Sequence, residues 1–188
     1  MEHMFVPDAS RSHGLSPSVV LGIDPGLTRC GYAVLHTENL QSIRALSLGV
    51  IRTPATMPLP QRLALLQVEV GDLISQYGPG AVAVEQVFFQ NNVRTAMSVG
   101  QASGVVLALA SAAGCEVAQY TPSQVKNSVA GWGGADKVQV QRMVQQRLGL
   151  SAAPKPADAA DAAAIALCHA SVAPVRNATQ AALMRSAR

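Results

Sequence analysis

Four acidic residues of this sequence lie next to or within apolar segments, where a charged carboxylate is unexpected. Asp24 ends the apolar run VVLGI, and Glu85 ends the apolar run AVAV. Asp158 and Asp161 are three residues apart in the alanine-rich stretch KPADAADAAAIALCHA, so they project from one face of one helix. Like charges on one face repel, although aspartates near a helix N-terminus also gain about 0.3–1 kcal/mol from the helix dipole. The pair alone is therefore equally well explained as a helix start; with Asp24 and Glu85, it favours a functional cluster.

Four carboxylates brought together are costly unless a cation neutralises them. Hard oxygen ligands without paired Cys or His spacing favour Mg²⁺, with Mn²⁺ as the alternative, over zinc. Two such ions about 3.5–4 Å apart activate water and stabilise the leaving oxygen of a phosphodiester. The sequence contains neither the GxxxxGK[ST] pattern of a P-loop nor the GxSxG pattern of a serine hydrolase. The cluster therefore predicts metal-dependent phosphoryl hydrolysis.

Alternation and breaker residues predict the elements that position these acids. Five strands are expected at residues 19–24, 30–37, 42–53, 81–85 and 116–120. Helices are expected at 61–78, 93–114, from Thr121 to the GWGGA break, 137–149 and 157–170. This order predicts an α/β fold with a mixed five-stranded sheet and helices on both faces. Asp24 and Glu85 then stand at strand ends, where ligand-binding groups converge in open α/β sheets.

The 188 residues are expected to form one domain over 19–172, with a flexible arm at 1–18 and a flexible tail at 173–188. The sequence shows neither a secretion signal nor an apolar run of about 18 residues, which predicts a cytoplasmic protein with no membrane contact. Net charge is +3; outside the four acids, 14 basic residues face seven acidic ones. A basic body around a small acidic spot suits a polyanionic substrate, although simple solubility explains the charge equally well.

Five segments together resemble the RuvC family of bacterial Holliday junction resolvases: GIDPGLTRCGYAVL, AVEQVFFQNN, GQASGV, TPSQVKNSVAG and ADAADAAAIALCHA. The resemblance runs from about residue 19 to 170. It implies an RNase H-like, or retroviral integrase-like, fold and a homodimer. It also implies a Mg²⁺-dependent endonuclease of recombination and DNA repair, which cuts four-way junctions and acts with the branch-migration complex of RuvA and RuvB.

The same resemblance places the catalytic, metal-binding acids on Asp24, Glu85, Asp158 and Asp161. Some relatives carry His where this chain has Asp158, which makes its role the most adaptable of the four. The family's base-stacking aromatic falls on Phe88.

Further residues are candidates for DNA or subunit contacts. Phe88 and Phe89 follow Glu85 in a loop, where adjacent side chains point opposite ways, so one ring is expected to face DNA unless both fill the core. Lys126 and Lys137 match family lysines that contact DNA phosphate or the reacting site. The small residues Ala96, Gly100 and Gly104 recur every four positions and fit either the family's dimer helix or packing onto the chain's own sheet.

Other functions remain as alternatives at this stage. GIDPGLT resembles the phosphate turn of actin-like ATPases and sugar kinases, but those need two such lobes, and about 150 residues cannot supply both. A non-cutting junction-binding protein and another RNase H-like nuclease are the remaining alternatives. The sequence leaves Trp132 unassigned, and it favours a core or supporting role over metal ligation for His169.

Overall fold

The computed structural model describes residues 18–39, 41–86 and 93–186, with side chains described except at 93–95 and 174–186. The elements follow the predicted order. The strands are β1 (Ser18–Asp24), β2 (Arg29–Asn39), β3 (Ser42–Arg52), β4 (Ala81–Glu85) and β5 (Glu116–Tyr120). The helices are α1 (Leu59–Tyr77), α2 (Val93–Ala112), α3 (Pro122–Ala130), α4 (Lys137–Arg147) and α5 (Ala157–Ser186).

The strands form one mixed sheet in the order β3-β2-β1-β4-β5, as predicted. β1, β2 and β3 form an antiparallel meander, whereas β4 pairs parallel to β1, and β5 pairs parallel to β4. The central strand β1 is buried on both faces because its neighbours cover its edges and helices cover its surfaces. The carboxyl ends of β1 and β4 therefore lie side by side at one edge of the sheet.

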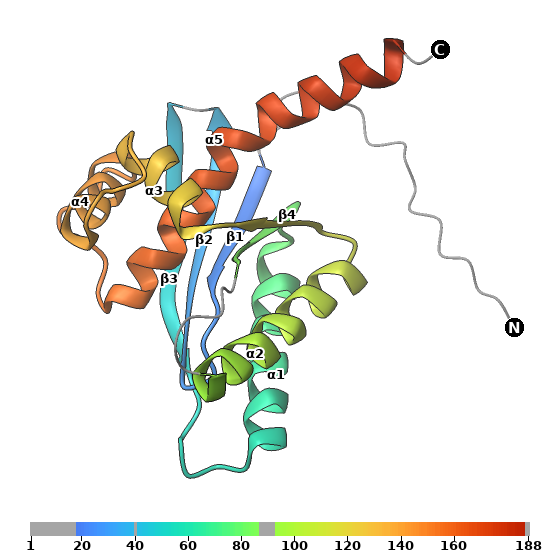
Figure 1. Cartoon of the computed structure of the whole chain (residues 1–188), viewed down its shortest axis with the longest axis vertical. Helices are drawn as coiled ribbons and strands as arrows, with labels where there is room; N and C mark the ends of the chain where they lie inside the picture. Colours follow the sequence, from blue (N-terminus) through green and yellow to red (C-terminus); the bar gives the residue numbers. More distant parts are fainter. Residues whose placement is uncertain (1–17, 40, 87–92, 187–188) are drawn as a thin grey trace, which may run out of the picture.

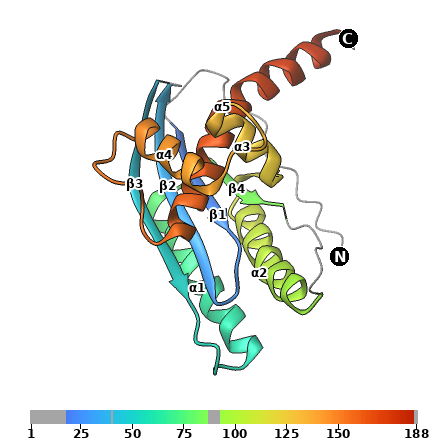
Figure 2. The ribbon, with the colours of Figure 1, turned by 60° about the vertical axis from the view of Figure 1, so that its left-hand side comes forward.

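Helices cover both faces of this sheet (Figures 1 and 2). One hydrophobic core joins Val20 of β1 to apolar side chains of α3, α4 and α5. The other joins Leu21 and Ile23 of the same strand to apolar side chains of α1 and α2. Successive β1 residues thus enter opposite cores, as the two-residue period of a strand requires.

Helix α5 lies unusually close to the sheet because glycines stand beneath it. A Cβ atom on Gly22 of β1 would lie 2.3 Å from the Ala162 carbonyl oxygen and 2.8 Å from the Ala166 Cβ. On Gly31 of β2 it would lie 2.1 Å from the Asp158 carbonyl oxygen. Backbone therefore packs on backbone, and the alanines of α5 keep the helix thin enough to fit.

One predicted boundary is wrong: α5 does not end at residue 170 but continues to Ser186, and Figure 1 shows its second half projecting from the body. Pro174 lies inside this helix, and the residues beyond it include good helix formers such as Ala, Gln, Leu and Met. The expected division into an arm, a domain and a tail stays a prediction. Across the part of the chain that the structure describes, none of the helices is both long and apolar enough to cross a membrane.

The contact between α5 and the sheet yields a stability prediction. We expect Gly22→Ala to lower the free energy of unfolding by at least about 1–3 kcal/mol, since the new methyl group must displace the α5 backbone. Gly71→Ala is the matched control, because it lies inside α1 with no atom within 4 Å of the new Cβ and should raise stability by about 0.5–1 kcal/mol. Urea denaturation followed by circular dichroism measures both, and a Gly22→Ala protein as stable as the parent would refute the close packing.

His169 is buried near the middle of α5, with 3% of its surface exposed, as its favoured core role implies. Its Nδ1 shares a hydrogen bond of 3.0 Å with the Tyr120 hydroxyl at the end of β5. Burial lowers the pKa of His169 from 6.5 to about 4. His169 therefore stays neutral in the folded protein at mildly acidic pH.

This burial predicts a loss of stability in mild acid. The folded pKa lies below the unfolded one, so as pH falls from 6.5 towards 4 the unfolded chain takes up the proton first. His169 should therefore cost about 2 kcal/mol of stability at pH 5 relative to pH 7. Urea denaturation in EDTA should show a smaller loss between these pH values for His169→Gln than for the parent, and an equal loss in both would contradict the assignment.

Candidate active site

Strand register brings Asp24 and Glu85 together. In the parallel pair of β1 and β4, Ile23 is opposite Val84, and each catalytic candidate is the next residue along its strand. Both side chains lie at the same edge of the sheet and are partly buried. Asp24 is also opposite Gly31 of β2, the glycine that touches the α5 backbone at Asp158. Three strands and one helix therefore meet at this point.

Asp158 stands in the first turn of α5 and pairs with a cation from β2. The Arg29 guanidinium donates to Asp158 Oδ2 from Nε at 3.1 Å and from Nη2 at 2.5 Å. These bonds hold the pKa of the Asp158 carboxyl below its usual range. The pairing explains how the helix tolerates this aspartate.

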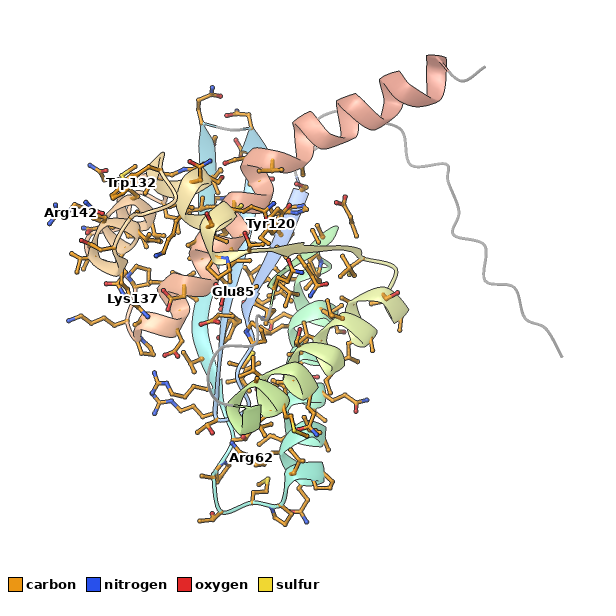
Figure 3. All side chains as sticks on the ribbon, in the orientation of Figure 1. Arg62, Glu85, Tyr120, Trp132, Lys137 and Arg142 are labelled. Carbon is orange, nitrogen blue, oxygen red and sulfur yellow. The ribbon has the colours of Figure 1, made fainter. Side chains whose placement is uncertain are left out.

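Asp161, one turn further along α5, pairs with Lys137 at the start of α4. Lys137 Nζ donates to Asp161 Oδ2 at 2.7 Å, and this bond raises the lysine's pKa. A reciprocal capping box between Asp136 and Gln139 fixes where α4 starts, and thus where Lys137 is presented. Figure 3 labels Lys137 together with Glu85 of the sheet edge.

Lys126 comes from α3, which begins at the predicted Thr121 capping box. It lies close enough to the sheet edge for its charge to act on Glu85 and favour the ionised carboxylate. The structure therefore brings both predicted lysines to the predicted acids, from two different helices.

The electrostatic couplings confirm that the four acids share one environment. Burial, together with the charges of Glu85, Asp161 and Asp158, raises the pKa of Asp24 to about 7. Burial likewise raises the pKa of Glu85, with a further contribution from Asp161. The charge of Lys137 acts in the opposite direction on both acids. Such a cluster gains stability from any added positive charge.

The four carboxylates are the kind of ligand that a hard divalent cation prefers, but they are not arranged around a common point. No group of three Asp, Glu, His or Cys side chains among the described residues is arranged to hold a metal ion as it stands. In this arrangement Arg29 and Lys137 hold the carboxylates of Asp158 and Asp161. Both pairs are partly exposed to solvent, and such pairs are weak enough to exchange. The residues therefore fit the ion once these carboxylates turn from their cations.

The remaining predicted positions divide into two groups. Phe88 and Phe89 lie outside the described residues. On α2, Ala96 is buried, whereas Gly100 and Gly104 are exposed, and a Cβ on either glycine would have no atom within 4 Å. The two glycines therefore do not serve packing onto the chain's own sheet, which was one of the two alternatives.

Sequence reasoning missed two arginines of this site. Arg29 is 129 positions from its partner Asp158, so no local pattern could pair them. Arg62 of α1 donates to Thr53 Oγ1 at 2.8 Å and to Thr28 Oγ1 at 2.6 Å, which ties the turn after Asp24 to the start of α1. The only available signal was that Thr28-Arg29 follows the DPG turn after a single residue, Leu27.

Comparisons with known proteins show the family of this chain. The chain matches the family model described as crossover junction endodeoxyribonuclease RuvC over residues 20–169. A protein of that name from Leifsonia xyli is 54% identical over 151 residues, covering 80% of this chain and 73% of the relative. Another from Corynebacterium jeikeium is 48% identical, covering 84% of this chain and 96% of the relative.

Two solved structures of Holliday junction resolvases have a similar fold. The structure of T. thermophilus RuvC in complex with Holliday junction substrate superposes with a TM-score of 0.79 at 42% identity, covering 83% of this chain and 94% of the other. The yeast mitochondrial Holliday junction resolvase Ydc2 superposes with a TM-score of 0.61 at 17% identity, a likeness of fold alone.

Proposed function

The chain belongs to the RuvC family of crossover junction endodeoxyribonucleases. We propose that it cuts four-way (Holliday) DNA junctions and that its catalytic residues are Asp24, Glu85, Asp158 and Asp161. The predicted RNase H-like fold is confirmed by the observed mixed sheet and by its structural neighbours. The observation that carries the site assignment is the coupling of Asp24 to the other three carboxylates. The activity serves homologous recombination and DNA repair.

Nucleases of this family depend on a metal ion, and the four carboxylates are the residues that would hold it. Two Mg²⁺ ions, or Mn²⁺ in their place, would lower the pKa of a bound water and polarise the scissile phosphate. Asp24 and Glu85 would provide ligands from rigid strand ends. Asp158 and Asp161 would become ligands on leaving their ion pairs with Arg29 and Lys137. Carboxylate oxygens are the ligands that both ions prefer.

The chain's own residues position and neutralise the DNA backbone. Released from Asp161, Lys137 can pair with the phosphate at the cleavage point, and Lys126 beside Glu85 can hold a neighbouring phosphate. Water oxygen bonds to phosphorus and the bond to the 3′ oxygen breaks, with a proton passing to that oxygen. The products are a 5′-phosphate and a 3′-hydroxyl. We propose that one of Phe88 and Phe89 contacts a base of the junction, with Phe88, on which the family's base-stacking aromatic falls, as the first candidate.

A homodimer explains how one junction receives paired cuts. A two-fold dimer presents two equivalent sites, which matches the two-fold symmetry of a four-way junction and places nicks in strands of like polarity. We propose that the dimer forms through α2, where Ala96, Gly100 and Gly104 are spaced by four. The exposure of both glycines supports this, because helix glycines with no internal neighbour leave room for a partner helix.

The setting follows from the same family. We propose that the enzyme works in the cytoplasm on junctions handled by the branch-migration complex of RuvA and RuvB. Its basic body outside the acidic site suits a polyanionic substrate.

The catalytic assignment predicts a separation of cutting from binding. Asp24→Asn, Glu85→Gln and Asp161→Asn should each slow junction cutting about 1000-fold or more, roughly 4 kcal/mol of barrier, because the ion loses a ligand. Junction affinity without metal should be retained, since these acids repel DNA. Asp72→Asn, an exposed acid on α1, is the control. Gels of labelled junctions with Mg²⁺ measure cutting, and normal cutting by any of the three variants would remove that residue from the site.

The dimer assignment predicts a change of mass without loss of fold. Gly100→Leu and Gly104→Leu should shift the protein towards monomer, because the larger side chains hold the partner helix away. Gly71→Leu is the control, since it also replaces a helical glycine with open space around it. Sedimentation equilibrium reports the mass and circular dichroism the fold. Unchanged self-association of both α2 variants would mean that subunits meet elsewhere.

A further inference from the structure

Trp132 is the chain's one tryptophan, and 55% of its surface is exposed. It lies in the turn between α3 and α4, in the sequence Gly131-Trp132-Gly133-Gly134. Aromatic side chains dominate core and interface energetics because they carry large apolar surfaces. None of the site chemistry described above uses this indole.

Gly134 supports the indole of Trp132, and Gly133 packs the turn that carries it against α3. A Cβ on Gly134 would lie 2.3 Å from Trp132 Cζ3 and 2.8 Å from Cε3, so the ring rests directly on the glycine backbone. A Cβ on Gly133 would lie 2.8 Å from Ser123 Oγ, which packs this turn against α3. The turn therefore supports one part of the ring and leaves the rest open to solvent.

The surroundings of Trp132 are basic. Residues 121–150, which comprise α3, the turn and α4, contain four basic residues and one acidic residue. That acid, Asp136, is engaged as the N-cap of α4. Arg147 is partly buried and donates to the Ser171 hydroxyl of α5, so it anchors the unit to the core. Lys126 and Lys137 face the acidic site, whereas Arg142 is exposed, and Figure 3 shows it with Trp132 on the side away from the sheet.

The indole is also within reach of the DNA that the site must hold. Trp132 and Lys137 are five positions apart in the sequence, so their Cα atoms lie at most about 18 Å apart. That distance equals about five nucleotide steps of 3.4 Å along one strand. A strand whose phosphate meets Lys137 can therefore reach Trp132 within about five nucleotides.

We propose that Trp132 is a further DNA-contact residue, whose indole stacks on a nucleobase left unstacked near the junction crossover. The inference rests on the proposed function, because the strand must be held at the acidic site. Exposed aromatic rings beside a cationic groove bind bases in this way. A protein partner would be the other occupant of this surface, but the excess of basic residues favours a polyanion.

The single tryptophan makes the proposal directly measurable. The full-length protein in EDTA is titrated with an unlabelled four-way junction, with linear duplex of the same length, and with heparin, which is a polyanion without bases. Labelled-junction anisotropy follows binding in parallel. At saturation we expect the junction to quench Trp132 emission by about half and to reduce its quenching by acrylamide. We expect heparin to do neither, and duplex, which has no unstacked base at a crossover, to do less than the junction.

Substitutions separate stacking from folding. Trp132→Ala should raise the dissociation constant for the junction about tenfold, and Trp132→Phe, which keeps a ring, should stay within about threefold of the parent. Val68→Ala, which trims an equally exposed apolar side chain on α1, should leave affinity unchanged. Far-ultraviolet circular dichroism confirms that each variant is folded.

The outcomes distinguish this proposal from the one it rests on. Saturable junction binding with unchanged Trp132 emission and with parental affinity for Trp132→Ala would overturn the stacking contact and leave junction resolution intact. Equal quenching by heparin would also overturn it, since charge alone would then explain the response. A protein that binds no junction by anisotropy would overturn both proposals.

Discussion

The close contact between the α5 backbone and the sheet is the constraint on which the site depends. Gly22 and Gly31 offer no side chain to the helix, and α5 meets them with the Ala162 and Asp158 backbones. One extra methyl group at either glycine would push the helix outward. Asp158 and Asp161 would then move away from the strand ends that carry Asp24 and Glu85. The alanines of α5 therefore favour the helix and also let it lie close enough to the sheet to position Asp158 and Asp161.

The electrostatics of the site follow from that packing. Burial, with the charges of the neighbouring acids, raises the pKa of Asp24 to about 7, and burial with the charge of Asp161 also raises that of Glu85. The chain offsets this cost with Arg29 and Lys137, which hold the two α5 aspartates. These two ion pairs neutralise Asp158 and Asp161 in the folded protein, and they are weak enough for a metal ion to replace the cationic side chains. Within the part of the chain that the structure describes, Asp24 and Glu85 form no ion pair, which suits them to receive a cation.

Much of this arrangement could be predicted from sequence because its determinants are local. Apolar runs ending in an acid placed Asp24 and Glu85 at strand ends, and the capping pattern at Thr121 located α3. The pairing of Arg29 with Asp158 joins residues 129 positions apart and depends on how α5 crosses the sheet. The helix beyond residue 170 was not predicted, since an interior proline such as Pro174 disfavours a helix, whereas the helix formers that follow it favour one. Exposure of Gly100 and Gly104 likewise needed the fold.

The most direct test of the account is where metal ions bind. Crystals of the Asp161→Asn protein and of the parent, grown with Mn²⁺ and a four-way junction, would be measured at the manganese absorption edge. The account predicts anomalous peaks among Asp24, Glu85, Asp158 and Asp161 in the parent, with Arg29 and Lys137 turned away from their carboxylates. It also predicts loss or weakening of a peak in the variant. Manganese bound away from these four carboxylates in the parent, or identical peaks in both proteins, would contradict it.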